Sequence, residues 1–508
     1  MSQASSNAAA ASALDTVQTS SLTDHLAKLD DKAGKIIKEL EPDQKSALGS
    51  FIRELLAGQQ FVDRNLTRAI KQRIADIDEA MQAQINVILH HPDFQKLEGT
   101  WRGLKSMMGG CEFGTRIKLQ IFDATKSELA DMFEEFDGAD YDQSPLFKQL
   151  YQTGLNIYGG NPYAAIVGDY ELAHGPEDVR VLRGMGKLAA VCHAPFIAAT
   201  HPSLMKLKAW TEINNRANVS SGMDKIEYAG WNSFRESEDA KYVALTLPRF
   251  LARLPYGKDK KDIKAFAFEE DTAGQQHDRY CWANAAYAMG RRVLESFNDY
   301  EWCTQICGPE AGGRVDELPI DLHEGADGQM HAKIPTEVSI ADDLERLLSM
   351  GDKKNAGMGL VPLVFRQNSD YAAFFSAQSM HKPKEFVGDD YSTSNSRLGA
   401  QLHNIFACSR FAHYLKVMVR DKIGGFASTD SLRKYLYEWI QSYVEPNPDQ
   451  VSDAQKAQRP LAEADVVVQP VPGQPGSYFA HFKLRPHYKL QALDVALSLV
   501  STVKTGDA

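Results

Sequence analysis

The sequence predicts a mixed α/β fold, in which helices cover sheets in two folded regions that follow an N-terminal helical arm. From Arg116 onward, short apolar runs of strand length alternate with helical stretches, a pattern typical of a sheet covered by helices. The 508 residues are 43% hydrophobic and 24% charged, which is ordinary for a globular protein and excludes disorder along the whole chain.

The first 56 residues predict an arm with short helices. Residues 1–21 are rich in Ala and Ser and contain neither Lys nor Arg, so they do not resemble a signal peptide. Leu22, Leu26 and Leu29 follow at steps of four and three, which places them on one face of a helix. A second helical patch covers residues 47–56.

A long helix is predicted from about Val62 to Leu89, and Pro92 is expected to end it. Its apolar residues recur at steps of three and four and form one stripe: Ile70, Ile74, Ile77, Met81, Ile85 and Ile88. We expect this stripe to pack against a core or a neighbouring subunit.

The middle of the chain predicts alternating strands and helices. Ile117, Leu119 and Ile121 alternate with polar residues, as in a strand. Residues 176–192 predict a helix with Pro176 at its first position. Further strands are predicted at 164–167, 195–199, 243–247, 266–268 and 359–365.

The C-terminal region predicts a helical block at 397–419 and two strands, Asp465–Gln469 and Tyr478–Leu484, which are separated by a turn rich in Pro and Gly. These strands could pair as a hairpin within the chain or add to the sheet of a neighbour, and an isolated segment favours the hairpin. We divide the chain into an arm (1–56), a middle domain (57–370) and a C-terminal domain (371–508).

No motif in the sequence predicts a catalytic site. Residues 184–187 (GMGK) lack the earlier glycine of a phosphate-binding loop and lie inside a helical pattern, which favours close helix packing. The charged residues at 235–239 are more typical of a surface ion-pair network than of acid–base catalysis. We therefore expect no enzymatic activity and no cofactor.

Cysteine and histidine spacing does not predict a metal site either. Cys303 and Cys307 would share a helix face, but no second pair of ligands stands at zinc spacing. His323 and His331 do not match a metalloprotease helix, and His90 and His91 are expected to cap a helix end.

Charge and composition limit the partners and the compartment. The 56 basic and 67 acidic residues give a net charge of −11, which argues against nucleic acid as a partner. No stretch reaches the roughly 20 apolar residues that span a membrane. Six scattered cysteines are typical of a reduced, cytoplasmic protein.

Several longer blocks of sequence resemble one family. In chain order they are HHPDFQKLEGTWRGLK (90–105), HAPFIAA (193–199), FRESEDAKYVALTLPRFLARLPYG (234–257), EAGGRVDELP (310–319), AAFFSAQSMHKPKEF (372–386), SRFAHYLKVMVRDKIGGF (409–426) and PGSYFAHFKLRPHYKL (475–490). Together they resemble the TssC/VipB/EvpB family, which forms the large subunit of the contractile sheath of type VI secretion systems.

The resemblance implies a structural protein that is not an enzyme. Members of the family pair with a small sheath subunit (TssB/VipA), and the heterodimers stack into a helical sheath around a tube of Hcp protein. The sheath assembles on a membrane-anchored baseplate in the bacterial cytoplasm, contracts to propel the tube, and is afterwards dismantled by the AAA+ unfoldase ClpV.

The resemblance also assigns roles to residues of this chain. It makes the two C-terminal strands interlocking strands between subunits, which reverses the preference for a hairpin. It makes Leu22, Leu26 and Leu29 a candidate unfoldase contact, by position and periodicity. The candidate inter-subunit residues are Asp465, Val466, Val467, Val468, Tyr478, Phe479, Phe482 and Leu484. Deleting 478–484 is expected to leave a folded heterodimer and to abolish long sheaths.

Two alternatives remain on the sequence alone. One is another self-assembling tubular or shell protein, and the other is an α/β enzyme with a site that carries no familiar motif. Tubules, closed shells or discrete particles in micrographs would separate the three.

Overall fold

The computed structural model describes residues 66–503 except for short internal segments, which are residues 110, 115, 158, 216–222, 258–260, 262, 264–265, 273–276, 325–329, 352–356, 367–368, 370, 422–428, 471–477 and 488–496. The chain divides into two compact units, Met1–Gln84 and Ile85–Ala508. The predicted arm, with Leu22, Leu26 and Leu29, lies outside the described residues.

Helix α4 (Leu66–Leu89) confirms the long helix expected before Pro92. Its apolar stripe is open: Ile74, Ile77 and Met81 are each more than 40% exposed. Packing of these residues on a core of their own chain, one of the two expectations for the stripe, is therefore not seen among the described residues.

The second unit contains a six-stranded sheet in the order β1-β2-β3-β9-β10-β6. The first four strands of this order run parallel, whereas β10 is antiparallel to both β9 and β6. The strands are β1 (Ile166–Leu172), β2 (Phe196–Thr200), β3 (Val243–Leu247), β9 (Val361–Phe365), β10 (Ala372–Phe374) and β6 (Arg314–Val315).

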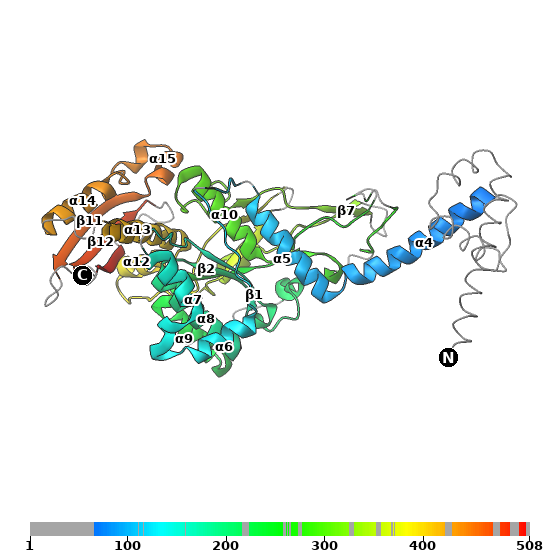
Figure 1. Cartoon of the computed structure of the whole chain (residues 1–508), viewed down its shortest axis with the longest axis horizontal. Helices are drawn as coiled ribbons and strands as arrows, with labels where there is room; N and C mark the ends of the chain where they lie inside the picture. The colour runs from blue at the N-terminus through cyan, green and yellow to red at the C-terminus, as the bar shows by residue number, and fades with distance from the viewer. Residues whose placement is uncertain are drawn as a thin grey trace, which may run out of the picture. The chain divides into compact units, whose positions relative to one another are not determined.

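Helices cover both faces of this sheet (Figure 1). On one face lies α8 (Pro176–Cys192) with α6 (Lys126–Glu135) packed on it, and on the other lies α10 (Ala285–Tyr300) with α5 (Pro92–Met108). Because side chains of a strand alternate between faces, Phe196 belongs to the core beneath α8 and its neighbour Ile197 to the core beneath α10.

The C-terminal region forms a second layered structure. Its three strands pair in the order β11-β12-β13. Helices α13 and α14 pack against them, as Figure 1 shows. The elements are α13 (Leu402–Asp421), α14 (Thr429–Gln441), β11 (Leu461–Pro470), β12 (Tyr478–Pro486) and β13 (Leu497–Val503). Their shared core is built around Trp302, Phe411 and Leu436.

Shorter elements connect these layers. The helices are η1 (Gly138–Gln143), α7 (Pro145–Phe147), η2 (Lys148–Asn156), η3 (Pro202–Met205), η4 (Trp210–Asn215), η5 (Ile226–Tyr228), α9 (Ala229–Arg235), η6 (Glu238–Tyr242), η8 (His277–Arg279), α11 (Asp342–Leu348), α12 (Asp390–Gly399), η9 (Pro448–Gln450) and α15 (Asp453–Gln458). Two further antiparallel pairs are β4 (Phe250–Leu251) with β5 (Trp282–Ala283) and the hairpin of β7 (Asp321–Glu324) with β8 (Met330–Lys333). Within the described residues, no helix is both long and apolar enough to cross a membrane.

The predicted mixed α/β class is confirmed, and so are most of the predicted elements. The strand predicted at Ile117–Ile121 is wrong: this segment is not assigned to a strand, and Ile121 is 66% exposed. Within the segment, the Tyr163 hydroxyl donates to the side-chain oxygen of Gln120, and just beyond it the Tyr170 hydroxyl donates to the carbonyl of Ala124. The strand predicted at 266–268 is also absent from the described backbone. Both predictions rested on apolar patterning, which does not itself supply a backbone partner.

Candidate assembly interface

The two predicted interlocking strands pair with each other in this chain. Strands β11 and β12 run antiparallel, with Asp465 opposite Lys483 and Val466 opposite Phe482. Strand β13 adds to the far side of β12 and is the last strand of this sheet. The structure thus contains the hairpin that the residues alone favour, and pairing with a neighbour stays a prediction.

The side chains of these strands divide into two sets. Four of the predicted residues are buried beneath α13 and α14: Val466, Val468, Phe482 and Leu484. Asp465 and Val467 are half-buried on the other face, and Tyr478 and Phe479 belong to β12, with side chains outside the description. Because the buried set fills the core of this chain, a partner strand would meet the backbone edge of the sheet rather than these side chains.

Helix α5 has a second surface suited to assembly, which the sequence reading missed. Its buried face is made of Gly99, Gly103 and Met107, where a Cβ atom on Gly99 would lie 2.4 Å from the carbonyl oxygen of Trp282. Its opposite face is also apolar but exposed, and it carries Phe94, Leu97, Trp101 and Met108. The steps of three and four between Phe94, Leu97 and Trp101 are visible in the sequence and could have revealed this face.

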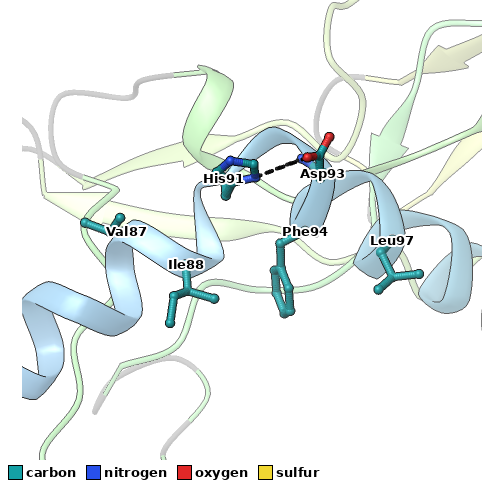
Figure 2. A pocket seen from close by; sticks show the side chains of 6 residues that line it. All are labelled: Val87, Ile88, His91, Asp93, Phe94 and Leu97. Carbon is teal, nitrogen blue, oxygen red and sulfur yellow. Dashed lines mark hydrogen bonds and ion pairs between the residues drawn. The ribbon is translucent and has the colours of Figure 1, made fainter.

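A shallow apolar groove of about 410 Å³ lies where α4 meets α5. It is lined by Val87, Ile88, His91, Asp93, Phe94 and Leu97. Figure 2 shows Ile88, Phe94 and Leu97 pointing to the same side of the bend, away from the linked pair His91 and Asp93. Leu97 is 55% exposed, and Trp101 one turn further is 58% exposed. Exposed apolar residues gathered in this way mark contacts with other molecules.

The bend itself is set by local sequence. Pro92 begins α5 rather than only ending α4, and the Nδ1 of His91 accepts a hydrogen bond from the backbone N–H of Asp93. His91 therefore caps the start of the second helix, whereas the sequence reading expected the histidines to cap the end of the first.

An ion-pair network fixes α5 to the body of the second unit. The guanidinium of Arg253 donates from Nε to Glu98 on α5 at 2.7 Å and from Nη1 to Glu270 at 2.6 Å. All three side chains are at most 10% exposed. Burial favours a higher pKa for Glu98, but hydrogen bonds from Arg253 and Arg102 outweigh it and hold the pKa below its ordinary value.

The motifs considered for chemistry have structural roles. Residues 184–187 lie within α8, and a Cβ on Gly184 would lie 2.3 Å from the ring of Phe133, so this glycine permits close helix packing. Arg235 is buried and donates to the carbonyls of Met380 and Gly357 at 3.0 and 2.7 Å. Glu238 pairs with Lys241 one turn along η6 and not with Arg235.

The cysteine and histidine pairs do not converge on a metal within the part of the chain that the structure describes, where no three such ligands gather. The Sγ of Cys307 lies 3.7 Å from Nδ1 of the buried His403. His323 and His331 are opposite each other in the backbone register of the β7–β8 hairpin.

Comparison with known proteins matches most of this chain to one family. Residues 71–381 match the model of the EvpB/VC_A0108 tail sheath N-terminal domain, and residues 391–503 match that of the EvpB/VC_A0108 tail sheath gpW/gp25-like domain. The chain is 42% identical over 476 residues to the type VI secretion system sheath protein TssC1 of Pseudomonas aeruginosa, covering 92% of this chain and 94% of that protein.

Among solved structures, a sheath tail protein from Desulfitobacterium hafniense aligns with 64% of this chain and 60% of its own, at 9% identity and a TM-score of 0.29. The two domain models lie in order and together match most of the sequence. This chain therefore belongs to the EvpB/VC_A0108 family, the large sheath subunits of type VI secretion systems.

Proposed function

We propose that this chain is a structural, non-enzymatic building block that pairs with a small sheath subunit and polymerises into a helical sheath around an Hcp tube. The C-terminal sheet carries this proposal. Its last strand, β13, pairs with β12 on one side and with no other strand in the described residues. A strand of a neighbouring sheath subunit would find backbone donors and acceptors at that edge.

Strand addition suits a sheath that changes shape. A row of backbone hydrogen bonds resists pulling along the filament and does not depend on particular side chains. Rigid bodies can then rotate against one another during contraction while the added strands keep neighbours attached. The side chains of β11 and β12 that fill the chain's own core would stay in place during this movement.

The exposed face of α5 supports a permanent contact with the small subunit. Permanent interfaces are more apolar than transient ones, and their centres are enriched in aromatic residues such as Trp101 and Phe94. Because Arg253 fixes α5 to the body of the subunit, this face is presented on a rigid support.

Family membership supports the remaining partners that we propose. We place the assembled sheath in the bacterial cytoplasm on a membrane-anchored baseplate, and we retain Leu22, Leu26 and Leu29 as the candidate contact for the unfoldase ClpV. These three leucines precede every described element, so the proposal for them rests on their position and spacing.

A truncation tests the linking role of β13. Deletion of 478–484 is unsuitable because β12 is the central strand and Phe482 and Leu484 are buried. Ending the chain at residue 496 removes β13 and leaves the β11–β12 hairpin, and a matched control ends at Val503 and keeps β13.

With the small subunit co-expressed, the shorter chain should still copurify as a heterodimer but form no long tubules in negative-stain micrographs. The control should form them. Tubules of normal length from the chain ending at 496 would refute a linking role for β13.

A further inference from the structure

The outer edge of β11 is closed by its own chain. Val466 donates its backbone N–H to Oδ1 of Asp465 at 2.9 Å, and its carbonyl accepts from Nε of Arg433 at 3.1 Å. The carbonyl of Ala464 accepts from Nε2 of Gln441 at 3.0 Å. Side chains of Asp465, Arg433 and Gln441 thus form hydrogen bonds with backbone groups of β11.

These backbone groups face away from β12. In an antiparallel sheet the N–H and C=O of one residue point to the same side, and residues alternate between the two sides. The backbone N–H and C=O of Val466 both bond to side chains and not to β12. These two groups therefore point to the edge of β11 that lies opposite β12. Ala464, two residues earlier, faces the same edge.

Helix α14 runs along this edge in the opposite direction to β11. Arg433 near its start reaches Val466, and Gln441 at its end reaches Ala464. The chain just beyond continues the pattern, because the backbone N–H of Leu461 donates to Tyr443 and its carbonyl accepts from Glu445. A register shift between Leu461 and Glu463 turns Leu461 toward this edge, so backbone groups of Leu461, Ala464 and Val466 are all hydrogen-bonded there within the chain.

We propose that Arg433, Gln441 and Asp465 are edge guards, which prevent a second copy of this chain from pairing with β11 and confine strand addition to the β13 side of the sheet. This inference rests on the proposed function, in which a strand of a neighbouring subunit joins this sheet. It adds that the outer edge of β11 is closed to a neighbouring strand and that Arg433, Gln441 and Asp465 close it.

The chemistry of the three residues fits this role. An open edge offers carbonyl oxygens, which Arg and Gln satisfy as donors, and N–H groups, which Asp satisfies as an acceptor. The strand they cover contains the run Val466–Val468, and such β-branched segments associate readily when their edges are open. A subunit that polymerises in one geometry must keep such a segment from pairing at the edge that assembly does not use.

The test removes the guards and keeps the size of the side chains on α14. The guard variant carries Arg433→Met, Gln441→Met and Asp465→Ala in the full chain. The control carries Lys434→Met and Glu438→Met, which also place two methionines on α14 but at exposed positions paired with each other. Both are compared with the unaltered chain by sedimentation velocity and by hydrogen exchange of segment 464–468.

In the guard variant we expect dimers and larger species that the control lacks at the same concentration. In the monomer fraction, exchange in segment 464–468 should be roughly fivefold faster, as expected for the loss of one net hydrogen bond. The proposal is overturned if the variant sediments like the control and the segment exchanges at the same rate. If the triple variant loses its fold, the single variant Asp465→Ala decides by sedimentation velocity: self-association that the control lacks supports the guard, and sedimentation like the control overturns it.

These measurements use the purified chain and need no sheath. A failure of the guards is therefore distinct from a failure of the linking role, which the truncation at residue 496 tests.

Discussion

At the scale of single residues, His413 links α13 of the C-terminal region to α8. Its Nε2 donates to the carbonyl of Cys192 at 2.7 Å, and its side chain is buried. Burial, together with the nearby charges of Arg410 and Lys416, lowers the pKa of His413 to about 3, although the hydrogen bond to Cys192 opposes the shift. The folded protein thus keeps this ring neutral.

Acid should therefore weaken the folded state through His413. Below pH 6.5 the His413 imidazole binds a proton in the unfolded chain but stays neutral in the folded chain. The stability present above pH 6.5 is therefore lost as the pH falls toward 3. Between pH 7 and 5 the loss is about 2 kcal/mol for one such histidine.

Denaturant unfolding of His413→Gln at both pH values should show a pH dependence smaller by this amount. His193 and His403, whose pKa values are also lowered, should sustain the rest. An unchanged pH dependence in the variant would contradict the assignment.

Arg253 should matter more for stability than exposed ion pairs. Arg253→Met would leave Glu98 and Glu270 buried and without their shared cation, which typically costs about 3–5 kcal/mol. Lys434→Met breaks a pair in which both side chains are more than 60% exposed, and it should cost less than about 1 kcal/mol. Chemical denaturation measures both, and equal effects would show that the buried network does not anchor α5.

At the scale of elements, the two faces of α5 should respond differently to substitution. Gly99→Ala places a Cβ against the backbone at Trp282 and should destabilise the fold by about 1–3 kcal/mol. Leu97→Ser with Trp101→Ala alters the exposed face and should leave the melting temperature nearly unchanged while reducing copurification with the small subunit. Normal copurification of this double variant would remove α5 from the heterodimer contact.

Elements with strong local signals could be predicted from the sequence. The bounds of α8 and β3 match their predicted ranges because Pro176 marks a helix start and a run of four apolar residues and one threonine forms a buried strand. Ile117–Ile121 has the same kind of alternation, but strand formation depends on a backbone partner elsewhere in the chain, which one segment cannot reveal. The pairing of β11 with β12 is the hairpin that the residues alone favour, whereas the family resemblance had replaced it with pairing between subunits.

At the scale of the whole molecule, the sequence indicated a sheath subunit through blocks spread over the chain, and the family comparison confirms it. It could not indicate which edge of the C-terminal sheet is open. The closed edge depends on hydrogen bonds from Arg433 and Gln441 to residues of β11 that lie 23 or more positions away in the sequence. These contacts exist only after α14 packs on the sheet. The spacing of Phe94, Leu97 and Trp101 is visible in the sequence, but the burial of the glycine face of α5 depends on the positions of Tyr287 and Trp282 in the fold.

The central claim is that this chain is the repeating unit of a tube. Electron microscopy of the full chain purified with the small sheath subunit tests it most directly. We predict long tubules with helical order around a hollow or filled centre. Closed shells or discrete particles under all assembly conditions, from a folded and complete complex, would contradict the claim.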